Sequence, residues 1–156
     1  MNIQKKENII HQTIHAFSQT IEMFGLSPSD ARLFAFLYLH KNPLTLDDMC
    51  EALGRSKTSI STGIRNLVEM NLATRVWQKG VRKDLYQVNS ELFELFVHAS
   101  VAKWVDHTNQ QRGTLEELLK TLPHDDDNED LKQSLEELIA FHQEIGGAFQ
   151  KMKKSE

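Results

Sequence analysis

The segment from residue 44 to residue 88 constrains the fold most, because it holds two short amphipathic helices joined through a glycine. The first should begin at Thr45, which forms a capping-box pattern with Asp48, and should end at Gly54. Ser56 can cap the second, which should extend to about Asn71. Apolar residues recur at helical spacing in both: Leu46, Met49, Cys50 and Leu53 in the first, and Ile60, Ile64, Leu67 and Val68 in the second. Two short helices with this connection predict a helix-turn-helix.

A helix precedes this segment and a hairpin follows it. Ser27 and Pro28 suit the cap and first turn of a largely apolar helix that should run to about Lys41. Residues 73–77 and 84–88 should form two strands, and Gly80 permits the turn between them. The expected fold is mainly α-helical: a winged helix-turn-helix with one β-hairpin wing, flanked by long N- and C-terminal helices.

The flanking helices carry two apolar seams. The first, in residues 3–24, comprises Ile3, Ile10, Ile14, Phe17, Ile21 and Phe24, and the second comprises Leu131, Leu135, Leu138, His142, Ile145, Phe149 and Met152. Spacings of three, four and seven residues are typical of helix-pairing surfaces. Because seams of this size are rarely left in water, we expect a homodimer with both in its interface. The predicted organisation is an N-terminal dimerisation helix (1–25), a winged helix-turn-helix DNA-binding domain (26–89) and C-terminal dimerisation helices (90–156), with one long helix over about 90–122.

Positive charge is concentrated in the predicted helix-turn-helix and hairpin. Residues 55–83 hold seven Lys or Arg and one acid, Glu69, whereas the rest of the chain holds eleven bases and twenty-one acids. An otherwise acidic protein with this distribution is suited to a polyanion, and duplex DNA is the usual one. A winged helix can instead serve as a protein–protein adaptor without DNA sequence specificity. Protein docking does not require such an excess of bases, so we favour DNA.

The second helix of the helix-turn-helix is the expected reader of the major groove. Short polar side chains on its outer face can approach base edges, and an arginine adds a donor fork for guanine or phosphate. A helix N-terminus favours phosphate, an arginine near the hairpin tip can reach the minor groove, and lysines can contact phosphate. The predicted DNA contacts are Ser56, Lys57, Thr58, Ser61, Thr62 and Arg65 in the helix and Lys79, Arg82 and Lys83 in the wing.

Other classes of function find little support. We find no Gly-rich phosphate loop, no nucleophile–base constellation and no placed carboxylate pair, so we do not expect an enzyme or a cofactor. The single cysteine, Cys50, lies on an apolar stripe and should be a buried thiol. His11 and His15 have metal-ligand spacing but no third ligand nearby, so we expect no metal. The sequence has no signal-peptide pattern and no apolar run of about 18 residues, which predicts a cytoplasmic protein without membrane association.

The Gly54–Arg65 segment and the Trp77–Tyr86 hairpin resemble the GbsR-type branch of the MarR superfamily, over about residues 24–96. Members are winged-helix transcriptional regulators in which the terminal helices form a dimer and the recognition helix and wing touch DNA. The best-known members of the branch repress genes for choline uptake and glycine betaine synthesis, and choline relieves repression. The resemblance therefore implies a dimeric repressor of such genes that binds a near-palindromic operator and responds to choline or a related quaternary ammonium compound.

Aromatic residues after the wing are the candidate inducer site. Aromatic faces attract quaternary ammonium groups, which lack hydrogen-bond donors. A box built from at least two of Phe93, Phe96, Trp104 and Phe141 is one interpretation. The other is that aromatics at helical spacing belong to the core.

Overall fold

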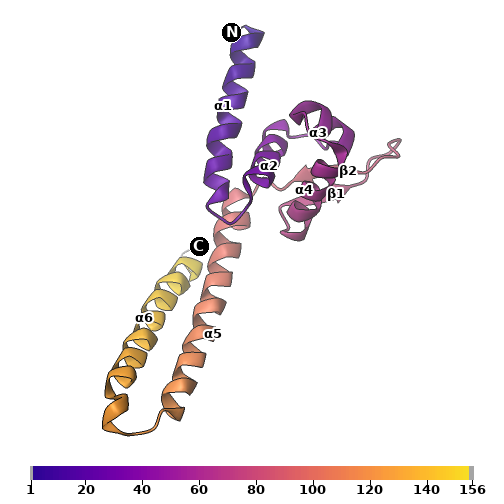
Figure 1. Cartoon of the computed structure of the whole chain (residues 1–156). Helices are drawn as coiled ribbons and strands as arrows, with labels where there is room; N and C mark the ends of the chain where they lie inside the picture. The colour runs from indigo at the N-terminus through magenta and orange to yellow at the C-terminus, as the bar shows by residue number, and fades with distance from the viewer. Residues whose placement is uncertain (1, 155–156) are drawn as a thin grey trace. The chain divides into compact units, whose positions relative to one another are not determined.

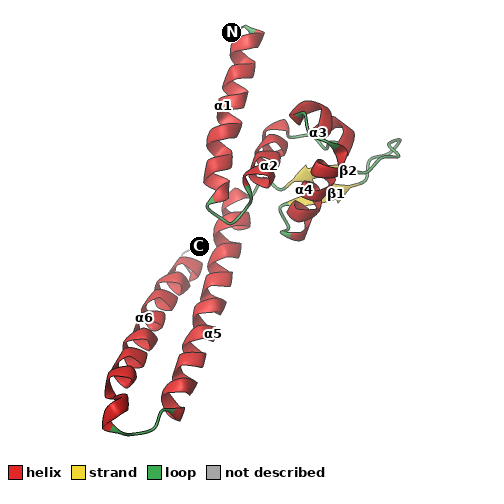
Figure 2. Ribbon diagram, in the orientation of Figure 1, coloured by secondary structure: helices red, strands yellow, loops and turns green. Residues whose placement is uncertain are grey.

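The computed structural model describes residues 2–154 and divides into two compact units, residues 1–96 and 97–156. Figure 1 follows the chain through both units, and Figure 2 shows that helices dominate, with a single pair of strands among the described residues. The predicted fold class, a mainly helical chain with a winged helix-turn-helix and one hairpin, is confirmed. No helix in the described part of the chain combines the length and apolar character needed to cross a membrane.

The first unit contains four helices followed by the hairpin. The helices are α1 (Ile3–Glu22), α2 (Pro28–His40), α3 (Leu46–Leu53) and α4 (Lys57–Glu69), and the strands are β1 (Ala73–Val76) and β2 (Leu85–Val88). The strands are antiparallel, with Ala73 opposite Val88 and Val76 opposite Leu85. Leu44 adds a short third segment, because its N–H and C=O exchange hydrogen bonds of 2.9 and 2.8 Å with the backbone of Tyr86. This bridge ties the start of the helix-turn-helix to the wing.

Side-chain caps set the helix boundaries in this unit. Ser27 and Ser56 each accept a hydrogen bond from a backbone N–H three residues on, at 3.1 Å. Thr45 and Asp48 form a reciprocal capping box, with both hydrogen bonds at 3.1 Å. Gly54 ends α3 in the left-handed conformation, at φ 63°, which glycine adopts without steric cost. All four boundaries agree with the sequence prediction because capping depends only on nearby residues.

The core of the first unit forms where α2 packs against α1 and α4, and α3 packs against α4. Phe34, Leu33, Met49, Ile60 and Leu67 are fully buried in it. The rings of Phe17 and Phe34 lie 6.3 Å apart, which fixes the second half of α1 on α2. Val68 was predicted on the inner face of α4 but is 37% exposed. That prediction is wrong because the row Ile60, Ile64 and Leu67 already fills the face toward the core, and Val68 lies beside it.

The second unit is a helical hairpin. A π-helical turn, Phe93–His98, spans the boundary between the units and leads into α5 (Ala99–Thr121). A short 3-10 turn, Asp126–Asn128, precedes α6 (Glu129–Lys154). Figure 1 shows α5 and α6 running antiparallel and side by side, in agreement with their many mutual contacts. Gly146 allows close approach, since a Cβ there would lie 3.3 Å from the Thr108 hydroxyl. The sequence predicted one continuous helix over about 90–122. The π-helical start differs from it because apolar spacing does not reveal a wider helical turn.

Candidate nucleic-acid interface

Helix α4 presents its polar residues to solvent while its opposite face is buried. Thr58, Thr62 and Arg65 are exposed and Ser61 is half-buried, whereas Ile60, Gly63, Ile64 and Leu67 are buried. The Thr62 hydroxyl donates to the Thr58 carbonyl at 3.0 Å, which fixes the position of its oxygen. The predicted face is thus a continuous surface of short polar side chains ending in an arginine, with a shape suited to a groove.

The buried side of α4 is held rigidly against α2. A Cβ at Gly63 would lie 2.9 Å from Leu33 Cδ2 and 3.3 Å from Asp30 Oδ1, so the two helices are in close contact there. The Asn66 side-chain amide donates to Asp30 Oδ2 at 2.9 Å. These contacts fix the orientation of α4, which any reader of base edges requires.

Arg55 has a structural role although the sequence counts it among the seven bases. Its guanidinium donates to Ser59 Oγ from Nε at 3.0 Å and from Nη2 at 2.7 Å, and to the Ser29 carbonyl at 3.4 Å. Arg55 therefore joins the start of α4 to the start of α2. The charge count overestimates the positive charge that is available to a partner.

The wing is an irregular tip beyond the short ladder. Residues 77–84 connect the strands, Gly80 has φ 84°, and the Val81 N–H donates to the Gln78 carbonyl at 3.1 Å. Lys79, Arg82 and Lys83 are all exposed. Two further exposed residues of the wing escaped the prediction: Arg75, which pairs with Asp84 at 3.6 Å, and Trp77, which is 81% exposed. Arg75 and Trp77 are two positions apart in a basic hairpin, and this alternation could have indicated that both lie on its exposed face.

An acid lies among the predicted phosphate contacts. The Lys83 ammonium is 2.6 Å from Asp47 Oδ2, and the Lys57 ammonium is 3.5 Å from Asp47 Oδ1. The hydrogen bond from Lys83 and the positive charge of Lys57 hold the pKa of Asp47 below its ordinary value. The same hydrogen bond raises the pKa of Lys83. Asp47, in the first turn of α3, thus connects the wing to the start of α4.

Comparison with known proteins shows which family has a similar winged helix. Residues 24–83, which include α2, α3, α4 and β1, match the MarR family. The winged helix is therefore similar to the MarR family over these residues. The match confirms the resemblance that the helix-turn-helix and hairpin indicated.

Three curated relatives come from Bacillus subtilis (strain 168). The transcriptional repressor OpcR is 29% identical over 116 residues, which cover 74% of this chain and 63% of OpcR. The putative regulator YvaV is 34% identical over 91 residues, 58% of this chain and 51% of YvaV. The repressor GbsR is 29% identical over 123 residues, 76% of this chain and 68% of GbsR. The chain thus spans about half to two thirds of their lengths. All three are named as HTH-type regulators and none as an enzyme, as expected.

A solved structure supports the fold. A crystal structure described as that of a transcriptional regulator superposes with a TM-score of 0.65 over 92% of this chain and 95% of its own, at 16% identity. At this identity the likeness concerns the fold alone. The fold of this chain therefore recurs in a protein with little sequence identity to it.

The aromatic residues that were predicted to form a ligand box belong to two different units. In the first unit, Phe96 is buried with its ring 5.3 Å from Phe24 and 5.2 Å from Phe34, while Phe93 is 64% exposed. In the second unit, the Trp104 ring lies 5.3 Å from Phe149, and Phe141 is edge-on to His142 at 5.8 Å. Phe149, the aromatic neighbour of Trp104, was not among the residues predicted for the box. The box itself remains a prediction.

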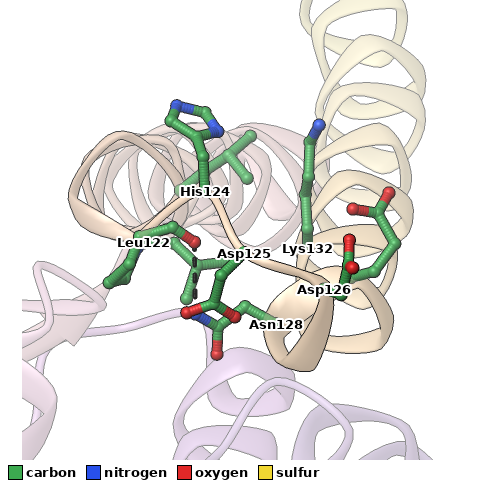
Figure 3. Close-up of a pocket in the computed structure, with 9 residues that line it drawn as sticks. Leu122, His124, Asp125, Asp126, Asn128 and Lys132 are labelled. Atoms are coloured by element: carbon green, nitrogen blue, oxygen red, sulfur yellow. Dashed lines mark hydrogen bonds between the residues drawn. The ribbon is translucent and has the colours of Figure 1, made fainter.

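A small pocket of about 200 Å³ lies at the turn between α5 and α6 (Figure 3). Its polar groups serve the turn: the Asn128 amide donates to the Pro123 carbonyl at 3.1 Å, and the Asp127 N–H to Asp125 Oδ1 at 2.9 Å. We assign it no ligand.

Within residues 2–154, no cluster of three His, Cys, Asp or Glu side chains is arranged to hold a metal. Cys50 is half-buried.

Proposed function

We propose that this chain is a sequence-specific DNA-binding transcriptional regulator that acts as a dimeric repressor. The observation that carries the proposal is the two-sided character of α4. Its buried side is fixed by Gly63 and Asn66 against α2, while its outer side presents Thr58, Thr62 and Arg65 beside a wing that carries Lys79 and Arg82. The MarR-family match and the HTH-type relatives support the same reading.

In this proposal, the outer face of α4 enters the major groove. Arg65 reads a base, and Ser61 and Thr62 approach base edges or phosphates. Ser56, Lys57 and Thr58 contact phosphate at the helix N-terminus. In the wing, Arg82 reaches the minor groove, and Lys79 and Lys83 bind phosphate, which adds affinity without sequence information.

Dimerisation would come from apolar side chains that the flanking helices expose. The first half of α1 leaves Ile3 78% exposed and Ile9 and Ile10 about half-exposed. On α6, the large side chains of Leu131, Leu138, Phe141 and Met152 also face solvent in part. A two-fold dimer that covers these residues would set two copies of α4 roughly 34 Å apart, one turn of DNA, on a near-palindromic operator. Sedimentation analysis at micromolar concentration should show a dimer; a stable monomer would contradict this arrangement.

The regulated genes that fit best are those for choline uptake or glycine betaine synthesis, with choline or a related compound as inducer. The support is the resemblance to the GbsR-type branch, the relative named GbsR, and the ring pair Trp104–Phe149, whose faces could hold a trimethylammonium group. Calorimetry with choline and glycine betaine measures binding, and a gel shift with added choline measures release. Binding that survives Trp104→Ala unchanged would move the site elsewhere, and no heat at millimolar choline would remove the inducer from the proposal.

A gel shift on the DNA upstream of the chain's own gene tests the central claim. Arg65→Ala should weaken operator binding by roughly 1–3 kcal/mol and relax base preference at one position. Arg32→Ala is a matched control, since Arg32 is an exposed arginine on α2, which packs against the buried side of α4. An adaptor without DNA specificity would bind operator and unrelated duplex equally weakly, with or without Arg65.

A further inference from the structure

The negative charge of Asp47 opposes DNA binding, and its contacts lie inside the candidate interface. Its carboxylate bridges Lys83 at 2.6 Å and Lys57 at 3.5 Å. Both lysines are predicted phosphate contacts, one from the wing and one from the first turn of α4. The side chains are about half-exposed for Asp47 and about two-thirds exposed for both lysines, so the group is open to a ligand from solvent.

The surroundings of Asp47 form a site of the kind that receives an anion. A shallow cavity of about 300 Å³ is lined by Thr45, Leu46, Asp47, Lys57, Arg82, Lys83 and Asp84. Asp84 pairs with Arg75, which lies outside this lining. Three cations from two separate elements therefore converge on one hollow, at the N-terminal end of α4, where backbone N–H groups also favour negative charge. The carboxylate of Asp47 already supplies negative charge to two of these cations.

We propose that Asp47 is an internal counter-ion that competes with a DNA backbone phosphate for Lys57 and Lys83. The inference rests on the proposed DNA-binding function and deepens it. When DNA arrives, a phosphate replaces the carboxylate as the partner of the two lysines, and Asp47 remains near the phosphate as a like charge. Asp47 therefore lowers affinity for every DNA sequence alike, which keeps nonspecific binding weak.

The exposed geometry limits the size of the effect. An exposed ion pair changes an equilibrium constant by at most about fivefold. Two pairs share one carboxylate here, so removing its charge should tighten DNA binding about two- to tenfold. Without the Asp47 carboxylate, one more positive charge is available to DNA phosphates. The plot of log K against log salt should therefore become steeper by about 0.9, the value for one further phosphate contact.

The experiment measures fluorescence anisotropy of a labelled operator duplex and of an unrelated duplex of equal length, at several salt concentrations. The test variants are Asp47→Asn and Asp47→Ser, both of which leave the Thr45–Asp48 capping box in place. Glu51→Gln is the matched control because Glu51 lies one turn further along α3, is exposed and carries the same charge. A third comparison measures the effect of Asp47→Asn in a chain that already carries Lys57→Gln and Lys83→Gln, relative to that chain without the Asp47 substitution.

The proposal expects both Asp47 variants to tighten binding to the two duplexes equally, at least twice as much as Glu51→Gln does. It also expects the gain to fall to the Glu51→Gln level when the two lysines are replaced. A gain no larger than the control, a gain that persists without the lysines, or weaker binding than wild type would overturn it. The wild-type chain decides the proposed function separately: if it binds neither duplex, DNA binding itself is refuted and the inference with it.

Discussion

Gly63→Ala should show how tightly the recognition helix is packed. In an open helical position, replacing glycine by alanine stabilises a helix by about 1 kcal/mol. At Gly63 the new Cβ would lie 2.9 Å from Leu33 Cδ2 and 3.3 Å from Asp30 Oδ1. Leu33 is completely buried, so its side chain has little room to move. Overpacking of this kind costs about 1–3 kcal/mol, which cancels or exceeds the gain.

A matched control separates the strain from the helix propensity. Gly113 lies within α5, and a Cβ there would meet nothing within 4 Å. Gly113→Ala should therefore stabilise its helix by about 1 kcal/mol. The difference between the two variants isolates the strain at Gly63, which we expect to be about 1–3 kcal/mol. Urea unfolding followed by circular dichroism measures both, with separate transitions fitted if the two units unfold separately.

The same substitution should disturb function through geometry. If α4 tilts to relieve the contact with Leu33, its outer face no longer matches the groove, and operator affinity should fall more than affinity for unrelated DNA. Equal stabilisation by Gly63→Ala and Gly113→Ala, with unchanged operator binding, would refute the close packing of α2 and α4 that the structure shows.

Three further predictions concern single side chains. Thr45→Ala should lower the free energy of unfolding by about 1 kcal/mol in urea titrations, since it removes the capping box, whereas Thr45→Ser should retain most of it. Because the pKa of Asp47 is lowered in the folded state, its contribution to stability is present above the unfolded pKa of about 3.9 and is lost as pH falls below it; carboxyl NMR should show this pKa rising in Lys83→Ala. Acrylamide should quench Trp77 fluorescence in Trp104→Phe more than it quenches Trp104 in Trp77→Phe, because Trp77 is 81% exposed and Trp104 40%.

Local chemistry explains which parts of the fold could be predicted from the sequence. The caps at Ser27, Thr45 and Ser56 and the turn at Gly54 depend on residues three or four positions apart, and all are found where expected. The hairpin was predicted within one residue at its inner ends, since Gly80 and the alternation of the strands are also local. The bridge between Leu44 and Tyr86 was missed because it joins residues 42 positions apart.

The candidate interface shows the same division. The exposed face of α4 follows from helical spacing, and the structure exposes Thr58, Thr62 and Arg65 as predicted. The partners of the charged residues do not follow from spacing. Asp47 and Lys83 are 36 positions apart, so only the folded hairpin brings them together. The aromatic residues after the wing were grouped because the family resemblance suggests a quaternary ammonium ligand, whereas the structure gives Phe96 to the core of the first unit and pairs Trp104 with Phe149.

The distribution of charge in the fold refines the argument from composition. Seven bases stand against one acid in residues 55–83, but Arg55 joins two helices and Arg75 pairs with Asp84 inside the wing. Lys57 and Lys83 share Asp47, an acid outside that stretch of sequence. A count along the sequence treats these charges as equal. In the fold, Arg55 joins two helices and Arg75 is paired within the wing, whereas Lys57 and Lys83 hold a partner that DNA can replace. A single phosphate can replace the Asp47 carboxylate, but only a polyanion can contact the other exposed bases of the wing at the same time, so the arrangement favours duplex DNA over a single free anion.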